Sequence, residues 1–86
     1  MEANVAAEVY SKKGEVIKKF STPDKLPTTK KEEKELFKFY KDEVELNKEI
    51  DINEVDKIVC KSFINPIKLI IFKRNKSEWK KEIKDN

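Results

Sequence analysis

The fold of this chain is decided by residues 29–46, TKKEEKELFKFYKDEVEL. When successive residues advance by about 100°, the apolar side chains of this stretch fall within about half of a helix circumference. We expect the buried face to consist of Leu36, Phe37, Phe39, Tyr40, Val44 and Leu46. A strand over the same residues would mix lysines with aromatic side chains on both of its faces. The pattern therefore predicts an amphipathic helix over about residues 30–47.

The start of this helix has its own signal. Thr29 and Glu32 have the spacing of a capping box, in which each side chain satisfies a backbone N–H that the first helical turn leaves free. The residues before it, 21–29, contain Pro23 and Pro27 and predict a loop, because proline cannot join the interior of a sheet.

The N-terminal part of the chain predicts a β-hairpin. Residues 5–10 and 16–20 are two short runs that favour strands, and the only glycine of the chain, Gly14, lies between them. A hairpin loop of three to five residues needs a positive φ angle, which glycine adopts without steric cost.

The C-terminal half predicts further strands. Residues 67–72 form the most apolar segment, rich in β-branched side chains and too short for a helix, so we expect a central strand that follows a turn at Asn65 and Pro66. Residues 50–52 alternate as a short strand would. The pattern of residues 53–60 fits either a strand or a helical turn, and periodicity over so short a run does not decide between them.

The last segment predicts a short helix. Asn75 and Glu78 have the spacing of an N-cap and its reciprocal acid, and Trp79 and Ile83 lie one helical turn apart. We expect this helix over about residues 76–84.

Together these elements predict a single small domain over residues 1–86 of the α+β class, in the order ββαββ(β)α. An antiparallel sheet of four to five strands would carry both helices on one face. The chain is too short for two independent domains.

The composition excludes most catalytic chemistry. The chain has 86 residues, of which 43% are charged, but it has no histidine, one glycine and one cysteine. General acid–base catalysis, zinc sites and phosphate-binding loops depend on these scarce residues, so we expect neither an enzyme nor a bound cofactor. Cys60 has no disulfide partner within the chain and no histidine to activate it, which indicates a structural thiol in a reducing compartment.

Acidic residues gather in the middle of the chain, at Asp42, Glu43, Glu45, Glu49, Asp51, Glu54 and Asp56. Carboxylates can bind a divalent cation, but the spacing matches no calcium loop and lacks the glycine that such a loop requires. We interpret them as a solvated helix face and turn residues, and we expect no metal site.

Basic residues gather on the hairpin and in the last part of the chain, and they would form one positive surface if these segments were neighbours in the sheet. The residues of this predicted binding patch are Lys12, Lys13, Lys18, Lys19, Lys68, Lys73, Arg74, Lys80 and Lys81. A positive surface attracts acidic proteins, nucleic acids or anionic lipids. The patch is nearly all lysine, which acts as a point charge, so any binding of nucleic acid would be independent of sequence.

The end of the chain resembles a pleckstrin-homology domain, in which the last strand leads into a helix with a buried tryptophan. Trp79 and Ile83 carry this resemblance. So do the hairpin lysines, which lie where that family holds phosphoinositide phosphates: Lys12, Lys13, Lys18 and Lys19. The resemblance implies binding of anionic lipid headgroups. The chain is shorter than that fold by at least one strand, and its helix from Lys30 falls where the family has strands.

We therefore expect a small non-catalytic binding protein of the cytoplasm that docks on an acidic surface of a partner protein. The adjacent blocks of opposite charge suit such docking and also head-to-tail self-association. We expect no signal peptide, because the first residues of the sequence show no basic segment followed by an apolar run, and we expect no membrane span, because no run reaches roughly 18 apolar residues. Compact, lysine-rich chains of this kind are typical of inhibitors that viruses and mobile elements encode. The alternatives are non-specific nucleic-acid binding and a pleckstrin-homology-like function.

Overall fold

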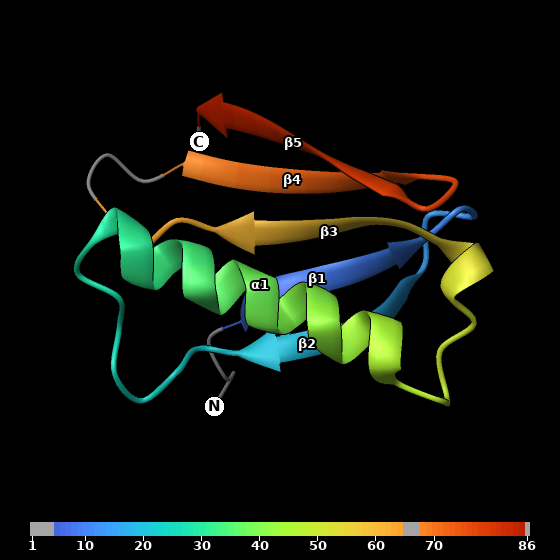
Figure 1. The fold of residues 1–86 in the computed structure, drawn as a ribbon, viewed down its shortest axis with the longest axis horizontal. Coiled ribbons are helices and arrows are strands. Elements are labelled where there is room, and N and C mark those ends of the chain that lie inside the picture. The colour runs from blue at the N-terminus through green and yellow to red at the C-terminus, as the bar shows by residue number, and fades with distance from the viewer. Residues whose placement is uncertain (1–4, 65–67, 86) are drawn as a thin grey trace.

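The protein consists of one α-helix packed against a five-stranded antiparallel sheet (Figure 1), as seen in a computed structural model that describes residues 5–64 and 68–85. The elements are β1 (Val5–Ser11), β2 (Val16–Ser21), α1 (Lys30–Leu46), the 3-10 turn η1 (Ile52–Glu54), β3 (Val55–Lys61), β4 (Lys68–Asn75) and β5 (Glu78–Asp85). The strands lie in the order β2-β1-β3-β4-β5, and every neighbouring pair is antiparallel. The predicted α+β class is confirmed.

The predicted hairpin is present as β1 and β2. Gly14 has a φ angle of 86°, the positive value that the loop requires. The backbone N–H of Ser11 donates to the carbonyl of Glu15 at 2.8 Å and closes the loop. The glycine was therefore a reliable signal for the position of the turn.

Helix α1 begins where the capping residues predict. The hydroxyl oxygen of Thr29 accepts a hydrogen bond from the backbone N–H of Glu32 at 3.1 Å. The predicted loop before α1 is also present, because the residues between β2 and α1 form neither helix nor strand.

The buried face of α1 is narrower than the sequence predicts. Phe37, Tyr40 and Val44 are buried against the sheet, whereas Phe39 is 52% exposed and Leu46 is 79% exposed. Phe39 lies about 200° around the helix from Phe37, so the two side chains point in opposite directions. A single helix lying on a flat sheet buries only one stripe, and the expectation that Phe39 and Leu46 belong to it was wrong.

The core lies between α1 and the face of the sheet that α1 covers. Phe37 packs edge-on against Phe72 of β4, with ring centroids 5.7 Å apart, and Tyr40 stacks on Phe20 of β2 at 4.6 Å. Ile58 of β3 is fully buried beneath them. The core thus joins strands from both halves of the sheet through one helix.

The predicted C-terminal helix is wrong, because residues 78–85 form strand β5 and pair with β4 along its whole length. Lys76 has a φ angle of 60° and lies in the turn between these strands, where the sequence predicts a helix start. Trp79 and Ile83 are four residues apart, a spacing that shares one face in a strand as well as in a helix. The resemblance to pleckstrin-homology domains depends on that helix, which the described residues lack.

The order of elements after α1 also differs from the prediction. Residues 50–52 do not form a strand; instead Ile52–Glu54 make the turn η1, which the side chain of Asp51 caps through the N–H of Asn53 at 3.0 Å. The ambiguous stretch 53–60 resolves mainly into β3. The turn predicted at Asn65 and Pro66 lies outside the described residues.

Helix α1 covers only part of the sheet. A helix is about 10 Å across and strands are about 4.8 Å apart, so one helix covers about two strands. Figure 1 shows α1 crossing in front of β1, with β4 and β5 extending beyond it. On the α1 side of β5, Ile83 is 55% exposed, and no described helix covers the opposite face of the sheet.

Candidate functional site

The predicted binding patch divides into separate surfaces. The two segments that carry it are not neighbours in the sheet, because β2 forms one edge and β5 forms the other. The condition for a single positive surface is therefore not met. Lys13 lies in the hairpin loop, and Lys18 lies on the α1 side with its ammonium group 5.3 Å from the ring centroid of Phe20. The other patch residues belong to three places described below.

The first place is a row of lysines across three strands. Lys57 of β3 pairs with Lys73 of β4, and Lys73 pairs with Lys80 of β5. Paired residues of antiparallel strands share one face, and successive residues alternate between faces. Ile58 and Phe72, the sequence neighbours of Lys57 and Lys73, point into the core, so the lysine row points away from α1.

We call this side of the sheet the open sheet face, since no described helix covers it. By the same register it carries six lysines: Lys19, Lys57, Lys61, Lys73, Lys80 and Lys84. Its centre is apolar, with Val59 and Leu69 half-buried and Ile71 buried outside the core beneath α1. Three glutamates, Glu8, Glu78 and Glu82, share the face, and Glu82 lies 3.9 Å from the ammonium group of Lys73.

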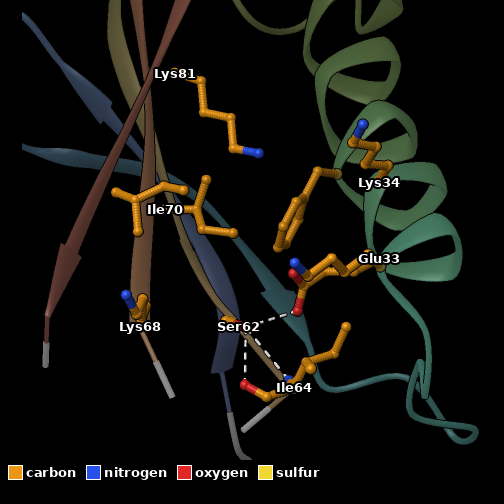
Figure 2. Close-up of a pocket in the computed structure, with 10 residues that line it drawn as sticks. Glu33, Lys34, Ser62, Ile64, Lys68, Ile70 and Lys81 are labelled. Atoms are coloured by element: carbon orange, nitrogen blue, oxygen red, sulfur yellow. Dashed lines mark hydrogen bonds between the residues drawn. The ribbon is translucent and has the colours of Figure 1, made fainter. Parts of the chain in front are cut away.

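The second place is a groove beside the N-terminal half of α1. It has a volume of about 360 Å³ and lies between α1 and the α1 side of β4 and β5. Its apolar lining includes Phe37, Ile70 and Ile83, and Ile83 is 55% exposed. Lysines surround this lining, with Lys30 and Lys34 on α1, Lys68 on β4 and Lys81 on β5. Figure 2 shows Lys81 extending from the sheet toward α1, with Ile70 directed into the space between them.

Glu33 is the only carboxylate among the described residues that line this groove. One of its oxygens, Oε2, accepts a hydrogen bond from the hydroxyl of Ser62 at 2.7 Å (Figure 2). The same oxygen accepts a second hydrogen bond from the backbone N–H of Phe63 at 3.0 Å. Both Glu33 and Ser62 are buried. This carboxylate therefore links α1 to the segment after β3, and its Oε2 oxygen is already used in that contact.

The third place is the end of the sheet where two turns meet. Lys12 of the hairpin loop lies beside Arg74 and Lys76 of the β4–β5 turn, around a cavity of about 560 Å³. The guanidinium of Arg74 donates to the carbonyl of Ile52 at 3.2 Å, and the backbone N–H of Lys12 donates to the carbonyl of Glu54 at 3.0 Å. These contacts hold η1 in place, which gives Arg74 a structural role.

The thiol of Cys60 and the hydroxyl of Tyr40 are both buried and hard to ionise. Cys60 is fully buried, and burial raises the pKa of its thiol to about 12, so the thiol stays protonated at neutral pH. Burial also raises the pKa of Tyr40 to about 12. Among the described residues, the acidic side chains do not gather into a group that could hold a metal ion.

The buried thiol predicts a loss of stability in alkali. In the unfolded chain the thiol ionises near its ordinary pKa of 9.0, whereas in the folded protein it stays protonated to about pH 12, so unfolding releases a proton and becomes easier as the pH rises. One such group contributes a slope of at most about 1.4 kcal/mol per pH unit.

Urea unfolding of the wild type and of Cys60→Ala between pH 9.0 and 10.0, below the ordinary pKa of tyrosine, measures this slope. The wild type is expected to lose stability more steeply. Equal slopes for the two proteins would contradict a buried, neutral thiol.

Several lysines of these surfaces were outside the predicted patch. Lys30 and Lys34 are two of them, and their spacing of four residues places both on the side of α1 that borders the groove. Lys57, Lys61 and Lys84 share the open sheet face with three patch residues. The alternation of residues along a strand is the signal that groups them, but it needs the register of β3, β4 and β5.

Comparisons with protein-family models, with curated proteins and with solved structures find no match to this chain. No helix in the described part of the chain has the length and the apolar character needed to cross a bilayer.

Proposed function

We propose that this protein is a non-catalytic binding protein whose open sheet face docks on an acidic surface of a partner protein. The observation that carries the proposal is the row of Lys57, Lys73 and Lys80 across three neighbouring strands. Like charges directly opposite each other destabilise a sheet. A partner that places carboxylates over this row would relieve the repulsion and gain charge-assisted hydrogen bonds.

The apolar centre of the open sheet face supports the same proposal. Val59, Leu69 and Ile71 lie on adjacent strands between the lysines. A protein interface typically has an apolar centre and a polar rim, and burial of the centre supplies most of the binding energy. Charged residues around it mainly set the association rate and the choice of partner.

Nucleic acid fits this face less well. Among the described residues only one aromatic side chain, that of Tyr10, lies on this face, and the ammonium group of Lys57 is 5.4 Å from the centroid of its ring. Stacking of successive bases requires several exposed aromatic rings. Arg74, the only arginine of the chain, points to the α1 side, so the open sheet face has no guanidinium group for bidentate contacts with phosphates or bases.

The test compares the affinity of matched variants for an acidic probe, a short labelled peptide that alternates glutamate and leucine. Reversing the lysine row in Lys57→Glu/Lys73→Glu/Lys80→Glu is expected to weaken binding about tenfold or more, which corresponds to about 1.4 kcal/mol. Fluorescence anisotropy at low salt measures the affinity.

The control variant Lys25→Glu/Lys31→Glu/Lys48→Glu has the same net charge and alters exposed positions outside the strands. It is expected to keep most of the affinity. If both variants lose affinity equally, the binding depends on net charge alone and the open sheet face is not the site.

A further inference from the structure

The outward side of α1 combines exposed apolar side chains with acids. Phe39 and Leu46 are seven residues apart and therefore lie on one side of the helix, and both are exposed. The carboxylates within about 60° of Phe39 around the helix axis are Glu32, Glu35, Asp42 and Glu43, and no lysine lies in that sector. We call this surface the acidic helix face. Phe39 and Leu46 thus give this acidic surface an apolar component.

The groove beside α1 has the complementary character. Its apolar lining includes Ile83, which is 55% exposed, and Lys30, Lys34 and Lys81 stand around it. Its only described carboxylate, Glu33, already accepts hydrogen bonds from Ser62 and Phe63. The groove is positive and apolar where the acidic helix face is negative and apolar.

The groove follows α1 from Lys30 to Phe37, which is about two helical turns. The acidic helix face is about four turns long, and its part around Phe39, from Glu35 to Asp42, matches the length of the groove. Beyond these turns the groove side of the sheet is bridged to α1, because the indole N–H of Trp79 donates to Glu45 at 2.7 Å. A second helix laid in the groove would extend the helical layer toward β5, where Ile83 is 55% exposed.

We propose that this chain associates with itself head to tail, with the acidic helix face of one copy seated in the groove of the next. Phe39 of one copy would contact the apolar lining, and the carboxylates around it would meet the groove lysines. The two contacting surfaces are different, so each copy presents its acidic helix face to one neighbour and its groove to another. Such contacts build a closed ring or an open chain. The open sheet face takes no part, so this proposal is independent of the proposed function.

Sedimentation equilibrium over a range of protein concentrations at low and high salt tests this association. The average mass of the wild type is expected to rise with concentration at low salt and to fall toward the monomer at high salt, because opposite charges hold the contact. A wild type that stays monomeric at every concentration would overturn the proposal.

Two charge-reversed variants identify the surfaces. Glu35→Lys/Asp42→Lys/Glu43→Lys makes the acidic helix face basic, and Lys30→Glu/Lys34→Glu/Lys81→Glu makes the groove acidic. Each variant alone is expected to be monomeric over the range in which the wild type associates, because its two surfaces now carry like charges. An equal mixture is expected to associate again, because each basic surface then finds an acidic one in the other variant.

Restoration in the mixture separates a specific contact from damage to the fold, since a misfolded variant would not regain association. Reversal of Lys57, Lys73 and Lys80 on the open sheet face is the matched control and is expected to leave association unchanged. The proposal is wrong if either single variant associates like the wild type, if the mixture stays monomeric, or if the control variant loses association.

Discussion

Phe37→Ala is expected to lower the free energy of unfolding by about 3–5 kcal/mol, the cost of removing a buried aromatic side chain and leaving a cavity. Phe37 is 3% exposed, and its ring centroid lies 5.7 Å from that of Phe72 and 6.4 Å from that of Tyr40. Helix α1 is the only described helix over this core, so no second helix can move in to fill the space. Urea unfolding followed by circular dichroism measures the loss.

Phe39→Ala is the matched control, because it removes the same side chain two residues further along α1. Phe39 is 52% exposed and makes an edge-to-face contact with Tyr40, with ring centroids 6.1 Å apart, so the expected loss is about 1 kcal/mol, well below that of Phe37→Ala. If the two variants lost similar stability, α1 would be rotated about its axis relative to the structure described here. The acidic helix face would then lose its exposed aromatic residue.

Glu33→Ala is expected to lower the free energy of unfolding by about 2–3 kcal/mol, because hydrogen bonds to charged groups are strong and their loss leaves buried polar groups unpaired. Oε2 of Glu33 accepts from both the Ser62 hydroxyl and the Phe63 N–H, across about thirty residues of sequence. The variant would leave both donors without this partner and would loosen the first turns of α1. Chemical denaturation of purified protein measures the effect.

Two further substitutions separate the effect of the charge of Glu33 from the effect of its hydrogen bonds. Glu33→Gln keeps a carbonyl oxygen that can accept both hydrogen bonds, so we expect a loss of about 1 kcal/mol, which reflects the missing charge. Glu35→Ala changes an exposed glutamate on the same helix and is expected to have little effect. A Glu33→Ala variant as stable as Glu35→Ala would show that the contact with Ser62 and Phe63 contributes nothing.

Local signals predicted the parts of the fold that local physics determines. Thr29 marks the start of α1 because its side chain replaces a missing backbone acceptor, and Gly14 marks the hairpin because its φ angle is positive. Neither feature depends on the rest of the chain. The period of the apolar residues likewise identified α1 as a helix, although the width of its buried stripe depends on what it packs against.

Residues 76–85 show where local reasoning fails. Asn75 and Glu78 imitate a helix start, and the spacing of Trp79 and Ile83 fits both kinds of element. The choice is made by pairing, because residues 78–85 hydrogen-bond along β4, which would otherwise have an open edge. Because β4 lies in another segment of the chain, the sequence of residues 76–85 alone does not decide between a helix and a strand.

The lysine surfaces could not be assembled from the sequence for the same reason. Lys57, Lys73 and Lys80 are spread over more than twenty residues and meet only through the register of three strands. Lys68 and Lys81 were predicted as part of one patch with Lys73 and Lys80, but strand alternation places them on the groove side. The number of basic residues was evident, whereas their division between two faces required the sheet.

NMR mapping tests whether the open sheet face is the docking surface. Labelled protein would be titrated at low and high salt with the peptide of alternating glutamate and leucine, with single-stranded DNA, and with anionic vesicles. We predict that the peptide shifts the amide signals of Val59, Ile71 and Lys73 at low salt, and that it binds more tightly than the DNA or the vesicles. Tighter binding of DNA or vesicles, or peptide shifts confined to the groove or the hairpin end, would contradict the claim.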